Sequence, residues 1–264
     1  MKDFRGGSSW PMLIQTTSGE RCVVKWKGTG EGPLGNAVEW ISLHLAQLSG
    51  IPVPTPHLVR VKADLANHKQ DPEINELILR SLGINLAVEW IEEALPFTPE
   101  RAQRIDDTMK RRIYCFDALF LNIDRTDFNP NIIFSADRMV CLDFAVLMEI
   151  KMLMNGQIAP ERTFLPLVRR HPFYRKGDEM LLALPDIHSD TIHEIIDSMP
   201  GEWLDDPSVI KPALLSGLTT ILKNAGPILR ERLRLLDEIP LETLEARNAR
   251  LHANRMAFEA KWPL

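Results

Sequence analysis

The sequence predicts an α+β fold with two lobes, a β-rich N-lobe at residues 1–94 and a mainly helical C-lobe at residues 95–264. Short β-branched runs separated by turn residues fill the first part of the chain, whereas apolar residues recur at helical spacing over most of the second. The segment "EEALPFTPE", residues 92–100, lies between the two patterns and is rich in proline, as a linker between lobes would be.

Composition and charge indicate an ordinary globular protein and argue against some kinds of binding partner. The 264 residues are 45% hydrophobic and 25% charged, and the net charge is −5, so binding to nucleic acid or to an anionic membrane is not expected. Three cysteines lie in apolar runs without metal-ligand spacing, which predicts reduced core thiols. The start "MKDFRGGSSW" lacks the apolar segment of a signal peptide, and we therefore expect a cytoplasmic protein.

The N-lobe is expected to combine a hairpin, a helix and further strands. Two β-rich runs, "PMLIQTT" and "RCVVKW", flank a Ser18-Gly19 turn and predict the hairpin. Apolar residues recur every three or four positions over residues 36–50, which predicts a helix with Asn36 as its N-cap. The run "INLAVEWI", residues 84–91, predicts a strand.

The C-lobe is expected to open with one long helix from Pro99 to Asn122. A polar loop follows, and then two short strands at "NIIF" and "MVCLDF". Helical patterns dominate from about residue 160 onward.

The polar loop "NIDRTDFNPN", residues 122–131, contains the first candidate site. Asp124 and Asn129 lie five positions apart, and Asp143 follows at the end of the next strand. A phosphoryl transferase needs one carboxylate at the acceptor hydroxyl, and an amide oxygen and a second carboxylate that hold Mg²⁺. Each residue alone is also typical of an ordinary Asx-rich turn. A calcium loop is excluded because the glycine and terminal glutamate of an EF-hand are missing.

Lys25 is the second candidate. On a strand it would share one face with Val23, inside an apolar run, where a lysine is costly unless it meets an anion. A phosphate or the helix carboxylate Glu39 would serve as that anion. The alternative is an edge strand whose lysines face solvent.

Two further features give weaker signals. The glycine-rich stretch of Gly6, Gly7 and Ser8 offers backbone N–H groups that can approach a phosphate, although no GxxxxGK[ST] loop is present. Basic residues gather at positions 169–176, where they would hold a phosphorylated or acidic acceptor or form a solvated loop.

The order of these features resembles that of kinase-like folds: a glycine-rich turn, a strand lysine, a helix glutamate, a hinge strand, Asp-x₄-Asn and a final Asp-Phe-Ala. No HRD triplet is present, and "NIDRTDFNPN" is similar to the catalytic loop of HipA-like kinases and phosphatidylinositol kinases. Together with "CVVKWKG" and "AVEWISLHLAQLSGIPVPTPHLV", this loop resembles the HipA-like kinase domain over roughly residues 5–205.

The resemblance implies a bilobal protein-kinase-like fold that binds ATP and Mg²⁺. Lys25 matches the phosphate-binding lysine and Glu39 its helix partner. Asp124 matches the catalytic aspartate, and Asn129 and Asp143 match the metal ligands.

The resemblance extends to further positions. Glu89, Trp90 and Ile91 would form the hinge that meets adenine. Asn131 lies so close to Asn129 that either could be the metal asparagine, and Ser8 falls near a loop that some HipA-like toxins phosphorylate. Ala145 replaces the glycine of the usual Asp-Phe-Gly motif, while the metal-binding aspartate of that motif is kept.

The function expected from the resemblance is transfer of the γ-phosphoryl group of ATP to Ser or Thr of a protein. An antitoxin-type partner is a further expectation. A kinase of small molecules or lipids is the alternative, because the loop is also similar to lipid-kinase loops. A nucleotide-binding scaffold without turnover is a third reading, although every expected polar group is present.

Overall fold

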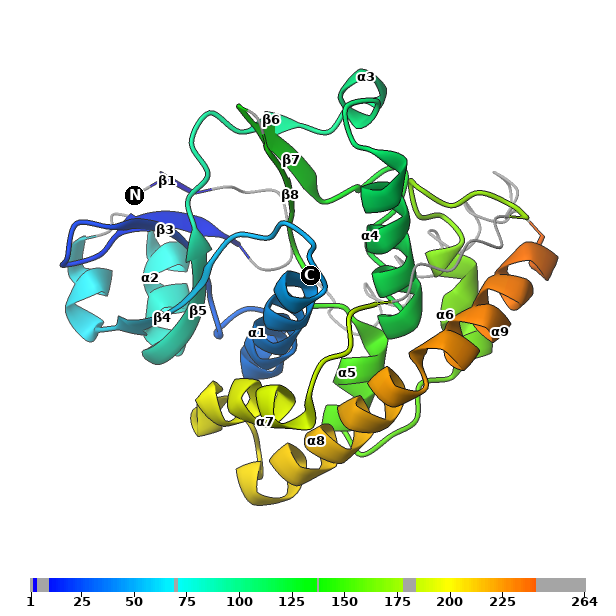
Figure 1. Ribbon diagram of the computed structural model, residues 1–264. Coiled ribbons are helices and arrows are strands. Elements are labelled where there is room, and N and C mark those ends of the chain that lie inside the picture. The colour runs from blue at the N-terminus through cyan, green and yellow to red at the C-terminus, as the bar shows by residue number, and fades with distance from the viewer. Residues whose placement is uncertain (1, 4–9, 69–70, 137, 178–183, 241–264) are drawn as a thin grey trace, which may run out of the picture.

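The computed structural model describes residues 2–3, 10–68, 71–136, 138–177 and 184–240. It contains one five-stranded antiparallel sheet, one three-stranded sheet and a set of helices packed beside them (Figure 1). This is the mixed α and β composition that the sequence predicts.

The larger sheet has the strand order β1-β2-β3-β5-β4. Its strands are β1 (Lys2–Asp3), β2 (Met12–Gln15), β3 (Arg21–Lys25), β4 (Pro56–Val61) and β5 (Gly83–Glu89). The predicted β2–β3 hairpin is present, and Gly19 in its turn has a φ of 89°, a backbone conformation that favours glycine.

The two faces of this sheet carry different helices. Cys22 and Val24 of β3 pack with the 3₁₀ helix η1 (Ala63–His68) and α2 (Pro72–Arg80). Lys25 alternates to the opposite face, the one covered by α1 (Gly32–Leu48), as the sequence predicts.

The rest of the described chain is mostly helical. A small sheet of β6 (Leu95–Pro96), β7 (Ile132–Ser135) and β8 (Arg138–Cys141) lies above the helices (Figure 1). The helices are α3 (Pro99–Ala102), α4 (Asp107–Phe120), α5 (Met148–Met154), α6 (Glu161–Val168), α7 (Ser189–Ser198), η2 (Gly201–Trp203), α8 (Pro207–Lys223) and α9 (Ala225–Glu238). The boundary predicted at residues 94 and 95 falls directly before β6, and the division into two lobes stays a prediction.

Two helix boundaries differ from the prediction. The helix expected from Pro99 to Asn122 is two helices, because the Asp106 side chain accepts a hydrogen bond from the Met109 N–H and starts α4 anew. Asn36 is not an N-cap, since α1 begins at Gly32 and Pro33 occupies its first turn.

Helix α1 is held from several sides. Its main contacts are with α5, α7, η2, β4 and β5. Lys151 of α5 lies 3.0 Å from Glu31 at its N-terminus, and the Trp40 indole N–H donates to the Ser198 hydroxyl at 3.2 Å. One hydrophobic core therefore runs from the sheet through α1 to the central helix α4.

Helix η2 is hydrogen-bonded to the start of β5. The Glu202 carboxylate accepts hydrogen bonds from the Ile84 N–H at 2.7 Å and from Lys27 Nζ at 2.9 Å. The Trp203 indole N–H donates to the Ile84 carbonyl at 2.8 Å. No helix in the described ranges is long and apolar enough to cross a bilayer.

The cap at Asp106 gives a testable prediction about the break between α3 and α4. Asp106→Ala should lower the free energy of unfolding by about 1 kcal/mol because the Met109 N–H in the first turn of α4 loses its acceptor. Asp106→Asn keeps a capping oxygen and is the matched control. Urea unfolding measures both, and an equal loss in the two variants would contradict the capping role.

Candidate active site

Three side chains from separate elements meet at one point. Lys25 Nζ, on β3, lies 3.1 Å from Glu39 Oε1 on α1 and 3.2 Å from Asp143 Oδ1 beyond β8. The Lys25 side chain is 12% exposed and that of Glu39 is 3% exposed, whereas Asp143 is 37% exposed. The predicted Lys25–Glu39 ion pair is therefore present, and Asp143 faces the same lysine.

Two neighbouring carboxylates keep the Lys25 ammonium group protonated. Burial alone would lower the pKa of its ammonium group, but the carboxylates of Glu39 and Asp143 outweigh burial and raise the pKa above its ordinary value. Lys25 thus stays positively charged at neutral pH. The more exposed of its two partners, Asp143, is the one that a phosphate could replace beside this buried cation.

The backbone around Asp143 is unusual. Asp143 and Asn131 have φ values of 55° and 50°, a left-handed conformation that non-glycine residues adopt at some energetic cost. The Leu142 N–H donates to the Asn131 carbonyl at 2.8 Å, which extends the β7–β8 pairing by one step. Asn131 and Asp143 are consequently fixed at the same end of this hairpin.

The polar loop folds around the Asp124 carboxylate. Asp124 Oδ2 accepts hydrogen bonds from the side-chain amides of Asn129 and Asn131, each at 2.9 Å. Asn122 forms an Asx turn, because its Oδ1 accepts from the N–H groups of Asp124 and Arg125. Asp124 is half-buried, and Asn129 is exposed.

Arg125 is the centre of this loop and is fully buried. Its Nε donates to Asp117 Oδ2 at 2.6 Å. Its terminal nitrogens donate to the carbonyls of Pro130 at 3.0 Å, Asn131 at 2.8 Å and Leu142 at 3.5 Å. One guanidinium group thereby connects α4, both ends of the loop and the residue before Asp143.

Asp117 of α4 anchors Arg125 in turn. Its carboxylate also accepts from Asn122 Nδ2 at 2.8 Å and from His171 Nε2 at 3.0 Å. Burial would raise the pKa of Asp117, but the charge of Arg125 and the donated hydrogen bonds hold that pKa below its usual range. His171 Nδ1 accepts from the Phe173 N–H at 3.1 Å, which places the ring proton on Nε2. Burial also lowers the pKa of His171, so the ring is neutral.

Part of this network was missed by sequence reasoning. Arg125 is paired with Asp117, and Asp127 contacts Arg170 at 3.3 Å. A charged residue inside the apolar run "FDALF" was the available signal for Asp117, since a buried carboxylate requires partners.

The basic cluster at residues 169–176 is not simply a solvated loop. Arg169 and His171 are buried. Arg169 Nε donates to the Ile239 carbonyl at 2.9 Å, and its guanidinium lies 4.3 Å from the centre of the Tyr174 ring.

The proposed hinge residues lie at the end of β5, where Glu89 is the last strand residue and Trp90 and Ile91 come directly after it. The Glu89 N–H donates to the Thr55 carbonyl, and its side chain pairs with Arg138 at 2.9 Å. Ile91 is buried, and Trp90 is half-buried. Contact with adenine stays a prediction for all three. Gly6, Gly7 and Ser8 lie outside the described residues.

The oxygen ligands available at this site suit Mg²⁺. Asp143 offers a carboxylate, and Asn129 and Asn131 offer amide oxygens once their side chains turn. Among the described residues, no group of three or more His, Cys, Asp and Glu side chains forms a metal cluster. A metal with few protein ligands that is completed by phosphate oxygens fits this set, as Mg²⁺ does with nucleotides.

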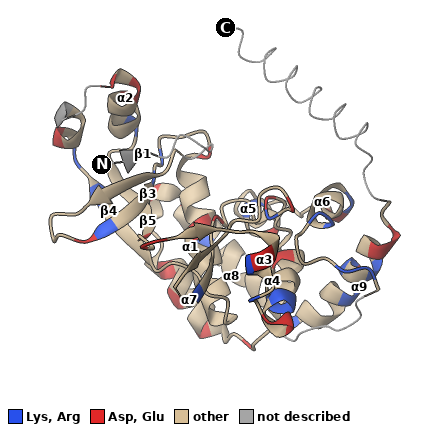
Figure 2. Cartoon of the chain, turned by 90° about the horizontal axis from the view of Figure 1, so that it is seen from above, with Lys and Arg blue, Asp and Glu red and all other residues tan. Residues whose placement is uncertain are grey.

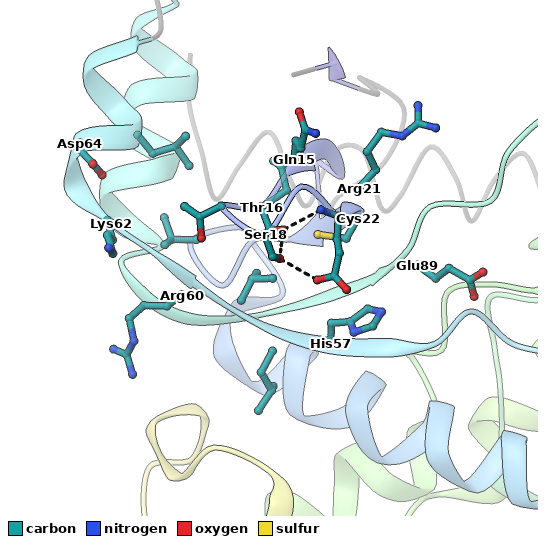
Figure 3. Close-up of a pocket in the computed structure, with 17 residues that line it drawn as sticks. Gln15, Thr16, Ser18, Arg21, Cys22, His57, Arg60, Lys62, Asp64 and Glu89 are labelled. Carbon is teal, nitrogen blue, oxygen red and sulfur yellow. Dashed lines mark hydrogen bonds between the residues drawn. The ribbon is translucent and has the colours of Figure 1, made fainter.

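A hollow of about 1040 Å³ lies away from this site. Figure 3 shows it on the outer face of the larger sheet, where residues of the β2–β3 turn, β4 and η1 surround Cys22. Lys25 lies on the other face of the same sheet. The hollow therefore does not include the Lys25–Glu39–Asp143 cluster.

Comparison with known proteins gives the family. The HipA-like kinase family matches residues 1–224. The chain belongs to this family. Family membership makes it a kinase in the general sense, a phosphotransferase that uses a nucleotide.

Other comparisons add little to this assignment. The solved structure of the Helicobacter pylori proinflammatory kinase CtkA is 13% identical, with a TM-score of 0.49 over 89% of this chain and 94% of that one. Curated protein sequences gave no match.

The Arg125 network gives a prediction about stability. Arg125→Met should lower the free energy of unfolding by about 3–5 kcal/mol because it leaves the Asp117 carboxylate buried without its cation. Arg170→Met removes the exposed Asp127 pair and should cost less than about 1 kcal/mol. Urea unfolding compares the two variants, and losses of similar size would contradict the anchoring role of Arg125.

Proposed function

We propose that this HipA-like kinase transfers the γ-phosphoryl group of ATP, bound with Mg²⁺, to the hydroxyl of a protein Ser or Thr. The observation that carries the proposal is the meeting of Lys25, Glu39 and Asp143 within 3.2 Å. A lysine paired with a helix glutamate, opposite a metal-binding aspartate, is the arrangement that kinases use to hold nucleotide phosphates.

Each residue of the cluster has a distinct task. Lys25 would bind the α- and β-phosphates, which replace Asp143 as its second anionic partner. Glu39 orients the lysine from α1. Asp143 and one asparagine would hold Mg²⁺, which supplies positive charge against the phosphates when bound.

The metal asparagine is better assigned to Asn131 than to Asn129. Asn131 pairs through its carbonyl with the residue before Asp143, and both lie at one end of the β7–β8 hairpin. Asn129 is exposed at the outer part of the loop, where its N–H closes a turn with Thr126. Both amides now donate to Asp124, so Asn131 would turn its oxygen toward the metal and leave Asn129 on Asp124.

Asp124 would act on the acceptor. Its Oδ2 accepts from two amide donors, whereas its Oδ1 makes no hydrogen bond to another described residue and would accept from a hydroxyl. The acceptor oxygen forms a bond to the γ-phosphorus as the bond to the β–γ bridging oxygen breaks. The hydroxyl proton passes to Asp124, and ADP leaves.

Asp124→Asn tests this role, since it removes the basic carboxylate with almost no change in shape. Phosphoryl transfer should fall by roughly 10²–10⁴ because a positioned general base is lost. Binding of Mg²⁺-ATP should survive, and thermal unfolding should change little. Turnover, calorimetric ATP affinity and melting temperature are measured on the same sample. Near-wild-type turnover would defeat the proposal and leave the loop as an Asx-rich turn.

The metal assignment is tested by comparing two alanine variants. ATP should raise the melting temperature more with Mg²⁺ than with EDTA, because a ligand that binds only the folded state stabilises it. Asn131→Ala should remove most of the Mg²⁺-dependent increment, and Asn129→Ala should keep it. The reverse pattern would return the metal role to Asn129.

A further inference from the structure

A second hollow, of about 410 Å³, lies beside the catalytic loop. Its walls come from α3, the first half of α4, the segment after α6 and the loop itself. The lining includes Phe97, Ala102, Tyr114, Asp127, Phe173 and Tyr174. We call this the α3–α4 pocket. Its size is in the range of pockets that hold small ligands or a single side chain.

The catalytic loop contributes directly to the pocket. Asp127 lies three residues after Asp124, and three residues of chain span at most about 11 Å. The Asp127 N–H donates to the Arg170 carbonyl at 2.9 Å, which fixes the loop against the segment that forms the opposite wall. Phe128, the next residue, is 65% exposed with Arg170 5.2 Å from its ring centre. A large apolar side chain is thus presented to solvent at the edge of the pocket.

The charged groups of the pocket are already paired. Lys110 and Arg175 each lie 3.3 Å from Asp107. Asp127 is paired with Arg170, and Arg111 also has an interaction partner. Figure 2 shows acidic and basic residues side by side along α3 and α4. A charged ligand would therefore gain little here, and it would have to displace an existing pair.

The surface that remains is aromatic. The rings of Phe97 and Phe173 lie 6.2 Å apart between centres, and those of Tyr114 and Tyr174 lie 6.0 Å apart. Pro99 and Pro172 complete the apolar walls. Binding between such walls is most favourable for an apolar side chain, because its surface is removed from water when it enters the pocket.

One polar group of the wall lacks a partner. The Tyr114 hydroxyl is buried, and it makes no hydrogen bond within the described residues. Burial raises the pKa of Tyr114, so the hydroxyl keeps its proton and is a donor. A buried donor without an acceptor is costly, and a carbonyl oxygen of a bound chain would relieve that cost once the wall opens enough to expose the hydroxyl.

We propose that the α3–α4 pocket is a specificity site for a peptide acceptor and takes an apolar side chain two to four residues from the phosphorylated Ser or Thr. The spacing follows from the upper limit of about 11 Å on the separation of Asp124 and Asp127, a length that an extended peptide covers in about three residues. This inference rests on the proposed function and specifies its acceptor. Phe128 would contact the peptide between the hydroxyl and the apolar residue.

The test uses a positional-scanning library of Ser- and Thr-containing peptides with Mg²⁺-ATP. The wild-type protein should prefer large apolar residues at one position two to four residues from the hydroxyl. Ala102→Trp fills the pocket from α3 without removing a core side chain, and it should lower kcat/KM for the preferred peptide about tenfold or more. The KM for ATP and the rate of ATP hydrolysis without peptide should not change.

Three further variants sharpen the result. Val209→Trp places the same bulk at an exposed position of α8 and should leave peptide kinetics at wild-type values. Ala102→Leu is a smaller addition that serves if the tryptophan variant does not fold. Tyr114→Phe keeps the shape of the pocket and should raise the KM for the peptide a few-fold with no loss of melting temperature.

Other outcomes would overturn the inference. Peptides phosphorylated without any apolar preference would do so, and so would an apolar preference that survives Ala102→Trp. Transfer to a soluble metabolite but to no peptide would overturn the assignment of the pocket as a peptide specificity site. The protein would still be a phosphotransferase in that case. Failure to bind or hydrolyse Mg²⁺-ATP would instead contradict the proposed function.

Discussion

The loop at residues 122–131 depends on the buried guanidinium group of Arg125. A guanidinium group without water is tolerable only when its charge and its donors are matched, and Arg125 meets this condition with Asp117 and three backbone carbonyls. Because these acceptors lie on α4, at the end of this loop and directly after β8, pairing the cation brings the three segments together. The positions of Asp124, Asn131 and Asp143 follow from this requirement.

The three asparagines of this loop each stabilise a different part of it through side-chain hydrogen bonds. Asn122 turns the chain after α4, and Asn129 and Asn131 hold one oxygen of Asp124. Short side chains have few rotatable bonds, so each hydrogen bond fixes its residue at low entropic cost. Rigid placement of this kind is what phosphoryl transfer asks of a protein.

Local patterns in the sequence were enough to predict the α+β class, the β2–β3 hairpin and the face on which Lys25 lies. The Lys25–Glu39 pair was predicted through the resemblance to kinase-like folds, since the residues alone also allowed a phosphate partner or a solvent-facing edge strand. Local patterns failed where the answer depended on distant segments. The Asp117–His171 contact joins residues 54 positions apart, and no local pattern encodes it. The break before α4 was also missed, since the periodicity of its apolar residues continues across the cap at Asp106.

The fixed position of α1 bears on how such an enzyme is restrained. Many kinases switch off by rotating the helix that bears the glutamate away from the lysine, a motion that requires loose packing around that helix. Here Lys151 and Ser198 contact α1 directly, and Glu202 ties the adjoining sheet to η2. The Lys25–Glu39 pair is thus formed with α1 in a position that several other elements hold, so turning the helix away would break those contacts as well as the ion pair.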